Sequence, residues 1–189
     1  EYHSYRRWVP LDVRTATAAD HESILRLVQA AFASDDRDGR EEIDIVMGCW
    51  ALATAPDGLE LVAIDEGLVV GHVLAARGRL DGREALAIAP LAVSPARQGE
   101  GIGTMLMQAL LRRAEHAGWP FVLLLGSPDY YGRFGFESSG PCEITYVPVG
   151  AGNPHFQIRR FAGYDPSYRG RFEYCWETEL GSTHGHATP

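Results

Sequence analysis

The chain has 189 residues, of which 46% are hydrophobic, so it is long enough for one sizeable core and too short for two comfortable domains. Its formal net charge of −8 argues against a broad binding surface for nucleic acid or for an anionic membrane. The three cysteines lie far apart and in no CxxC pattern, which argues against a disulfide framework or a thiolate metal site and favours a reducing cytoplasm.

A single domain is expected over residues 11–177, with an N-terminal extension at residues 1–10 and a flexible C-terminal tail at residues 178–189. No apolar run approaches the roughly 20 residues that a membrane-spanning helix needs, and the polar opening lacks the apolar core of a signal peptide. We therefore expect a cytoplasmic protein with no membrane partner, no nucleic-acid partner and no metal. The sequence is compatible with either a monomer or a homodimer.

Two amphipathic helices are predicted in the first part of the chain. A capping-box-like spacing of Thr17 and Asp20 marks the start of the first helix. Its apolar face is formed by Ile24, Leu25, Val28, Ala31 and Phe32. Residues 34–40 are expected to be a charged loop, and residues 41–50 predict a second, shorter helix.

The sequence then changes to short apolar runs that are rich in β-branched residues. Residues 59–64 and 68–75 flank the turn Asp65-Glu66-Gly67, which predicts a hairpin. Residues 85–93 are almost continuously apolar, and this pattern suits a strand that is buried on both faces. We therefore place the middle of the sheet at this strand.

The clearest helix prediction covers residues 102–117, whose apolar residues share one face and whose end is marked by Gly118 and Pro120. Residues 121–125 form a further buried strand. The strand-helix-strand order over residues 85–125 predicts a mixed α/β sheet that is covered by helices.

The rest of the predicted domain is expected to close this sheet. Residues 128–133 begin a short helix after the buried strand. Residues 142–149 and 155–161 are then expected to form antiparallel strands around a loop at residues 150–154.

A glycine-rich turn joins the central strand to the clearest helix within residues 90–103. Its glycines at positions 99, 101 and 103 let several backbone N–H groups and the positive end of the helix dipole converge on one point, which is typical of a phosphate site. The alternative is a tight turn that only lets the helix pack closely on the sheet. The register of the GxGxxG fingerprint is absent and no Walker lysine follows, so Rossmann and P-loop sites are excluded.

Two motifs resemble those of the GNAT superfamily of N-acetyltransferases. Gln98, Gly101 and Gly103 match the family's Gln/Arg-x-x-Gly-x-Gly/Ala loop, and Tyr131 to Phe136 match its Tyr-x-x-x-Gly-Phe motif. The amino-acid sequence over residues 11–177 is most similar to that of a bacterial YhbS-like subgroup. This resemblance implies the GNAT acyl-CoA N-acyltransferase fold, a central mixed β-sheet of about six to seven strands flanked by about four helices.

The resemblance also implies that acetyl-CoA is the co-substrate and that its acetyl group passes to a primary amine. The implied coenzyme contacts are Leu91, Ala92, Val93, Gln98, Gly99, Glu100, Gly101, Ile102, Gly103, Thr104, Ser127, Tyr131 and Arg133. Two of them have implied catalytic roles, because the N–H of Leu91 would stabilise the oxyanion and Tyr131 would donate a proton to the departing thiolate. From the residues alone, Tyr131 also fits a packed aromatic, and Arg133 fits either a coenzyme phosphate or solvent.

The family's conventional general base is missing. Many members carry a Glu on the central strand where this chain has Ala87. The candidates to replace it through water are Glu84, Asp35, Asp36 and His72. Each of them also fits a surface charge or, for His72, a residue packed within a strand. A water chain or an amine that arrives deprotonated is the further option.

The sequence is also compatible with two other functions. A GNAT-like domain without turnover would bind acetyl-CoA as a regulatory module, which Ala87 favours slightly and Tyr131 disfavours. An acyltransferase that uses another acyl-CoA would share the fold. The acceptor pocket is expected to involve the first two helices and the loops at residues 32–40 and 150–154, where the resemblance is weak, so the acceptor is not identified.

Overall fold

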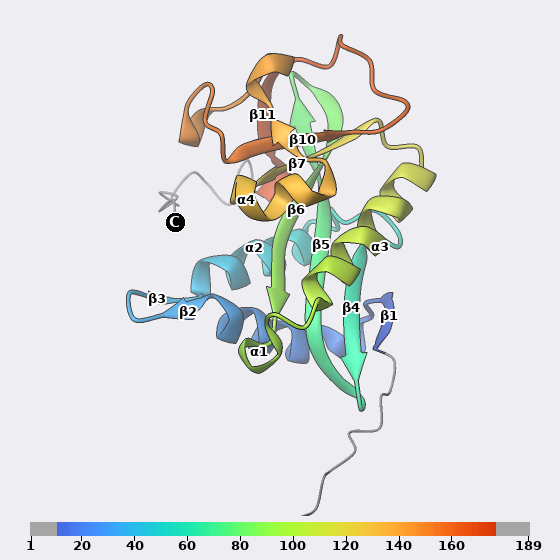
Figure 1. Ribbon diagram of the computed structural model, residues 1–189, viewed down its shortest axis with the longest axis vertical. Coiled ribbons are helices and arrows are strands. Elements are labelled where there is room, and N and C mark those ends of the chain that lie inside the picture. The colour runs from blue at the N-terminus through green and yellow to red at the C-terminus, as the bar shows by residue number, and fades with distance from the viewer. Residues whose placement is uncertain (1–10, 177–189) are drawn as a thin grey trace, which may run out of the picture.

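The computed structural model describes residues 11–176, which form a mixed sheet with helices on both faces (Figure 1). The expected extension at residues 1–10 and the expected tail at residues 178–189 lie outside these residues, so both stay predictions. Between residues 11 and 176, no helix is long and apolar enough to cross a membrane.

Within residues 11–176, nine strands form the main sheet. They are β1 (Asp12–Thr15), β4 (Glu60–Asp65), β5 (Leu68–Leu80), β6 (Arg83–Val93), β7 (Phe121–Leu125), β8 (Glu137–Ser138), β9 (Ile144–Tyr146), β10 (Phe156–Arg160) and β11 (Gly170–Tyr174). Their order in space is β1-β4-β5-β6-β7-β10-β8, and β11 pairs with both β5 and β9. The pairs β6–β7 and β9–β11 are parallel, and the other pairs are antiparallel.

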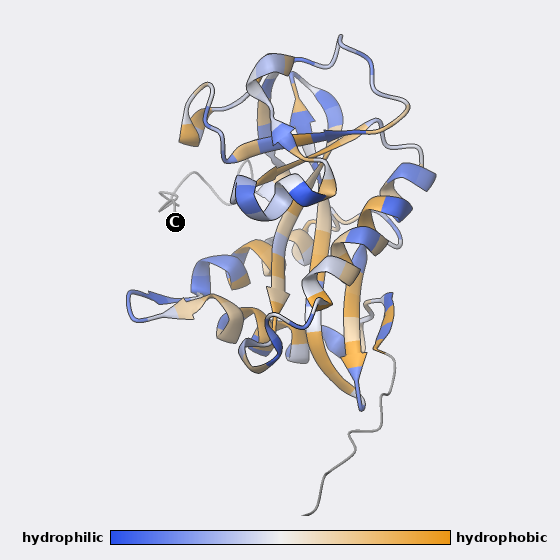
Figure 2. Ribbon diagram, viewed as in Figure 1, coloured by the Kyte–Doolittle hydropathy of each residue, from blue (hydrophilic) through white to orange (hydrophobic). Residues whose placement is uncertain are grey.

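In the described part of the chain, four α-helices accompany the sheet. They are α1 (His21–Phe32), α2 (Arg40–Ala51), α3 (Ile102–His116) and α4 (Pro128–Tyr131). Side chains alternate along each strand, so Leu61 and Ala63 of β4 join the core under α3, whereas Val62 joins the core under α1 and α2. Figure 2 shows the result, because the central strands are largely orange while the helices carry blue on their outer sides.

The predicted mixed α/β fold with four helices is confirmed, and its sheet has more strands than expected. α3 begins at the predicted Ile102, and β7 spans the predicted residues 121–125. β5 continues to Leu80, beyond its predicted end at residue 75, because it stays paired with β6 as far as Arg83.

Of the two closing strands predicted, the one at residues 155–161 is confirmed as β10, which is antiparallel to its neighbours, whereas the one at residues 142–149 is wrong. The latter run contains only the three-residue strand β9, between 3-10 turns at Gly140–Cys142 and Val147–Val149 that each carry a proline near their start. Proline has no N–H to give to a strand pairing, so it interrupts the run. β9 pairs with β11, whereas β10 pairs with β7 and β8.

The predicted loop at residues 34–40 is also more ordered than expected. It contains β2 (Ala33–Ser34) and β3 (Arg37–Asp38), which form a small antiparallel hairpin that projects from the molecule (Figure 1). The predicted short helix at residues 128–133 divides into α4 and a 3-10 turn at Gly132–Phe134.

Candidate active site

The central strand β6 separates from β7 beyond a single paired position. In the described part of the chain, their only pairing joins Ala87 to Leu123. On its other side β6 pairs with β5. Leu91 lies opposite Val73, and Ile88 lies opposite Ala75. The two residues of β6 are three positions apart, whereas their partners on β5 are two positions apart. The extra residue is a β-bulge, which bends the strand that carries it. The sheet therefore opens between the end of β6 and β7.

Main-chain donors line this opening. The N–H of Ser94 donates to the carbonyl of Val70 on β5 across 2.9 Å. Successive residues of a strand direct their N–H groups to opposite sides, so the N–H groups of Leu91 and Val93 face the side from which β7 has separated. Ala92 between them turns its N–H toward β5 and buries its side chain under α1 and α2. Of the three contacts predicted on β6, two thus present their N–H groups to the opening.

The loop between β6 and α3 presents a second group of main-chain donors. Gly99 and Gly101 have φ angles of 83° and 84°, a region that favours glycine. The first hydrogen bond within the helix start runs from the N–H of Met105 to the carbonyl of Gly101. Among the described residues, no hydrogen bond uses the N–H groups of Gly99, Gly101, Ile102, Gly103 or Thr104. With the positive end of the α3 dipole, these groups have the arrangement that binds anions at helix starts, and we call this loop the anion site.

The start of α3 lies directly beside the opening. A Cβ placed on Gly103 would be 3.6 Å from Cγ2 of Val93 and 3.8 Å from Cδ2 of Leu91. It would also be 2.6 Å from the hydroxyl oxygen of Tyr130 on α4. The free amides of β6, the anion site and α4 therefore meet at one place, and the absence of a side chain at Gly103 makes the room.

Tyr131 is the last residue of α4, the short helix that follows β7. Its N–H and that of Tyr130 donate to the carbonyl of Ser127 at 3.0 and 3.1 Å, so Ser127, a predicted contact, starts α4 through its main chain. The Tyr131 ring packs so closely on Gly126 that a Cβ there would be 2.3 Å from the ring. It also meets the rings of Tyr130 and Phe136 edge to face. Burial raises the pKa of the Tyr131 phenol well above its ordinary value, so the hydroxyl keeps its proton.

Gln157 on β10 is a supporting residue that the sequence analysis missed. Its side chain is buried, with a relative exposure of 1%. Nε2 donates to the carbonyl of Gly126 across 2.8 Å and thereby fixes the backbone on which the Tyr131 ring rests. The available signal was a glutamine between the apolar Phe156 and Ile158 of a predicted strand, because an amide that is buried there needs a partner.

Replacing Gln157 with Leu is expected to lower the free energy of unfolding by about 1–3 kcal/mol, because the carbonyl of Gly126 loses its donor. Urea unfolding measures the change. Gln108→Leu, on the exposed side of α3, is the control and should stay within about 0.5 kcal/mol of wild type. Equal stability of the two variants would show that the Gln157 bond contributes little.

Arg133, a predicted coenzyme contact, packs against Tyr130. Its Nε donates to the carbonyl of Tyr130 across 2.8 Å, and its guanidinium lies 4.5 Å from the centre of the Tyr130 ring. Tyr130 was not among the predicted site residues, yet its hydroxyl lies against Gly103 at the start of α3. The exposed Arg133 and the half-buried Tyr130 thus lie together at one edge of the opening.

The four candidate general bases differ in where they lie. Glu84 is seven residues before Leu91 on β6, about 20 Å at the rise of a strand, and it pairs with Arg77. His72 is fully buried, and its Nε2 lies 3.0 Å from Oε1 of Glu60. Asp35 and Asp36 are exposed at the tip of the β2–β3 hairpin. Ala87 itself is fully buried.

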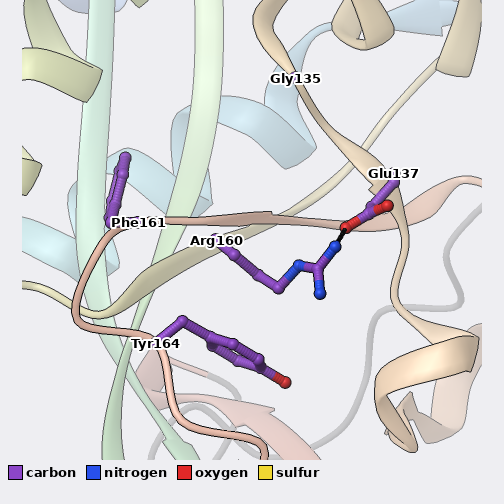
Figure 3. A pocket seen from close by; sticks show the side chains of 5 residues that line it. All are labelled: Gly135, Glu137, Arg160, Phe161 and Tyr164. Carbon is purple, nitrogen blue, oxygen red and sulfur yellow. Dashed lines mark ion pairs between the residues drawn. The ribbon is translucent and has the colours of Figure 1, made fainter.

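A separate hollow of about 560 Å³ lies over β10 and the segment before β8. Figure 3 shows Arg160 and Glu137 joined by an ion pair at its side, with the Tyr164 ring nearby. It contains none of the predicted site residues.

Known proteins resemble the chain in sequence and in overall fold. Residues 12–139 match a family model described as an acetyltransferase (GNAT) domain. The uncharacterized N-acetyltransferase YjhQ of Escherichia coli K12 is 33% identical over 133 residues, which cover 65% of this chain and 72% of YjhQ. The uncharacterized N-acetyltransferase YhbS of the same strain is 29% identical over 158 residues, covering 79% of this chain and 87% of YhbS.

Solved structures agree with the sequence relatives. Escherichia coli YhbS in complex with CoA superposes with a TM-score of 0.79 at 26% identity, covering 93% of this chain and 96% of YhbS. A GNAT family acetyltransferase from Brucella melitensis in complex with acetyl-CoA superposes with a TM-score of 0.71 at 29% identity, covering 87% of this chain and 96% of that protein. The chain therefore belongs to the GNAT acetyltransferase family, as a YhbS-like member.

Proposed function

We propose that the chain transfers the acetyl group of acetyl-CoA to a primary amine of a small molecule or peptide. The observation that carries this proposal is the meeting of three features at the opening of the sheet. These are the N–H groups of Leu91 and Val93, the free amides at the start of α3, and the protonated phenol of Tyr131. Solved relatives that hold CoA or acetyl-CoA support the choice of donor.

The donor would lie along β6 like an added strand, with its pantetheine amides paired to the main chain at Leu91 and Val93. Its pyrophosphate would accept hydrogen bonds from the free N–H groups at the start of α3. The side chains in this loop leave room for that approach, since Gly99, Gly101 and Gly103 have no Cβ.

In the chemical step, the amine nitrogen attacks the thioester carbon and the carbonyl oxygen takes up negative charge. The N–H of Leu91 stabilises that charge by a hydrogen bond. The carbon–sulfur bond then breaks, and the Tyr131 hydroxyl gives its proton to the departing sulfur. The new amide nitrogen loses its extra proton to water, and Tyr131 regains its own from solvent.

The acceptor supplies the nucleophile without help from a carboxylate at the usual place, because position 87 is a buried alanine. Glu84 is too distant from Leu91 to remove the proton, even through one water. We therefore propose that the amine binds in its neutral form or loses its proton to water.

A pH–rate profile tests this protonation scheme. The rate is expected to rise with pH as the acceptor amine loses its proton. No falling limb is expected below pH of about 10, since burial raises the pKa of Tyr131 above the ordinary phenol value. A bell-shaped profile with a falling limb near neutral pH would contradict Tyr131 as the acid.

The proposed activity is tested by calorimetric titration with acetyl-CoA followed by a screen of thiol release. The screen covers polyamines, amino acids, aminoglycosides and peptide N-termini. Binding at one site per chain together with thiol release in the presence of an amine supports the enzyme. Binding without turnover of any amine would instead indicate the regulatory module, and competition by longer acyl-CoAs would show a different acyl preference.

A further inference from the structure

The loop proposed to hold the pyrophosphate contains an acidic side chain. Glu100 directly precedes Gly101, the residue that caps the start of α3. Among residues 94–104, the charged side chains are Arg97 and Glu100. A free carboxylate beside the anion site would repel a pyrophosphate and weaken its binding, because the two charges have the same sign.

Arg97 forms ion pairs with two carboxylates, one of which is that of Glu100. Its Nε donates to Oε2 of Glu100 across 2.7 Å. Its Nη1 donates to the carboxylate of Asp65, the last residue of β4, beside the turn to β5. The Arg97 side chain is only 20% exposed, against 43% for Glu100. The Arg97 guanidinium therefore links the loop before α3 to the end of β4, and it holds the Glu100 carboxylate in an ion pair.

We propose that Arg97 is a positioning residue for donor binding, which neutralises Glu100 and holds it away from the pyrophosphate. This inference rests on the proposed function, because it needs the donor to bind at the start of α3. Arg97 does not serve as the phosphate ligand itself, since carboxylates already occupy both its Nε and its Nη1. The phosphate is left to the free main-chain N–H groups.

The test compares the dissociation constant of acetyl-CoA for wild type and three variants by calorimetry. Arg97→Gln is expected to weaken binding about tenfold, which corresponds to about 1.4 kcal/mol, because Glu100 is then unpaired beside the anion. The double variant Arg97→Gln with Glu100→Gln is expected to recover most of this loss, because the repelling charge has gone. The loss in Arg97→Gln should also shrink at high salt, since exposed charges are screened.

Asp65→Asn separates neutralisation from anchoring of the loop. It removes the tie to the β4–β5 turn but leaves the Arg97–Glu100 pair, so it is expected to cost less than Arg97→Gln. Arg26→Gln, which breaks the exposed pair of Arg26 with Glu22 on α1, is the control for loss of a surface arginine. It should leave the dissociation constant unchanged.

Failure of this inference is distinct from failure of the proposed function. No binding of acetyl-CoA to wild type would overturn the proposed function. Binding by wild type with no loss in Arg97→Gln, or with no recovery in the double variant, would overturn the role of Arg97 alone. If Asp65→Asn reproduced the full loss, Arg97 would act as an anchor of the loop and not as a shield for Glu100.

Discussion

Tyr131→Phe is expected to lower kcat by about 10²- to 10⁴-fold, the usual contribution of a general acid. The substitution removes one hydroxyl and keeps the ring that packs on Gly126 and meets Phe136. The fold and the affinity for acetyl-CoA should therefore persist. A loss in kcat without a matching change in the dissociation constant identifies an interaction that is made only in the transition state.

The measurement is steady-state turnover of the amine found by the screen, beside calorimetric titration of acetyl-CoA. Tyr164→Phe is the matched control, because it removes a phenol at the hollow of Figure 3, outside the opening. It should keep the kcat of wild type. Turnover by Tyr131→Phe at the same rate would remove Tyr131 from the mechanism and leave its ring as packing.

The position of Tyr131 also separates an enzyme from a binding module. A module that only senses acetyl-CoA needs the amides of β6 and α3, and it has no use for a protonated phenol at the end of α4. Here Gln157 holds the Gly126 carbonyl, and the bare Gly126 accommodates the Tyr131 ring. This support for the orientation of Tyr131 favours chemistry, whereas the alanine at position 87 concerns only the proton of the acceptor.

The sequence predicted those elements whose signal is local. α3 was clear because its apolar face, its starting glycines and its stop at Gly118 agree along one segment. β7 was clear because a short apolar run stands between a helix end and a turn. The position of the free N–H groups at the start of α3 followed from the same residues, since a strand, a glycine-rich turn and a helix start determine where these groups lie.

The parts that sequence reasoning missed depend on pairing across long distances in the chain. β11 pairs with β5, so Phe172 lies opposite Leu80, and no periodic pattern in either segment states that partner. The same holds for the contact of Gln157 with Gly126 and for that of Arg97 with Asp65. The contacts of Gln157 and Arg97 hold backbone and side chains next to the site in place. They can be identified only once the order of the strands in the sheet is known.

Gly101→Val is expected to weaken acetyl-CoA binding by about 10- to 100-fold. Hydrogen bonds to charged groups contribute about 1.5–3 kcal/mol, and a branched side chain at Gly101 would stand where the pyrophosphate must approach the start of α3. The fold should survive, because a Cβ at Gly101 meets no atom within 4 Å. The backbone strain of a φ of 84° in a residue other than glycine lowers the melting temperature but does not by itself touch the donor.

Gly118→Val isolates that strain. Gly118 follows the other end of α3, has the same φ of 84°, and a Cβ placed on it would likewise meet no atom within 4 Å. Both variants should therefore lose similar stability in a thermal scan, since each forces valine into the left-handed region. Only Gly101→Val should lose affinity in the calorimetric titration, because only its side chain lies at the free amides. Equal dissociation constants for the two folded variants would show that the pyrophosphate does not bind at the start of α3.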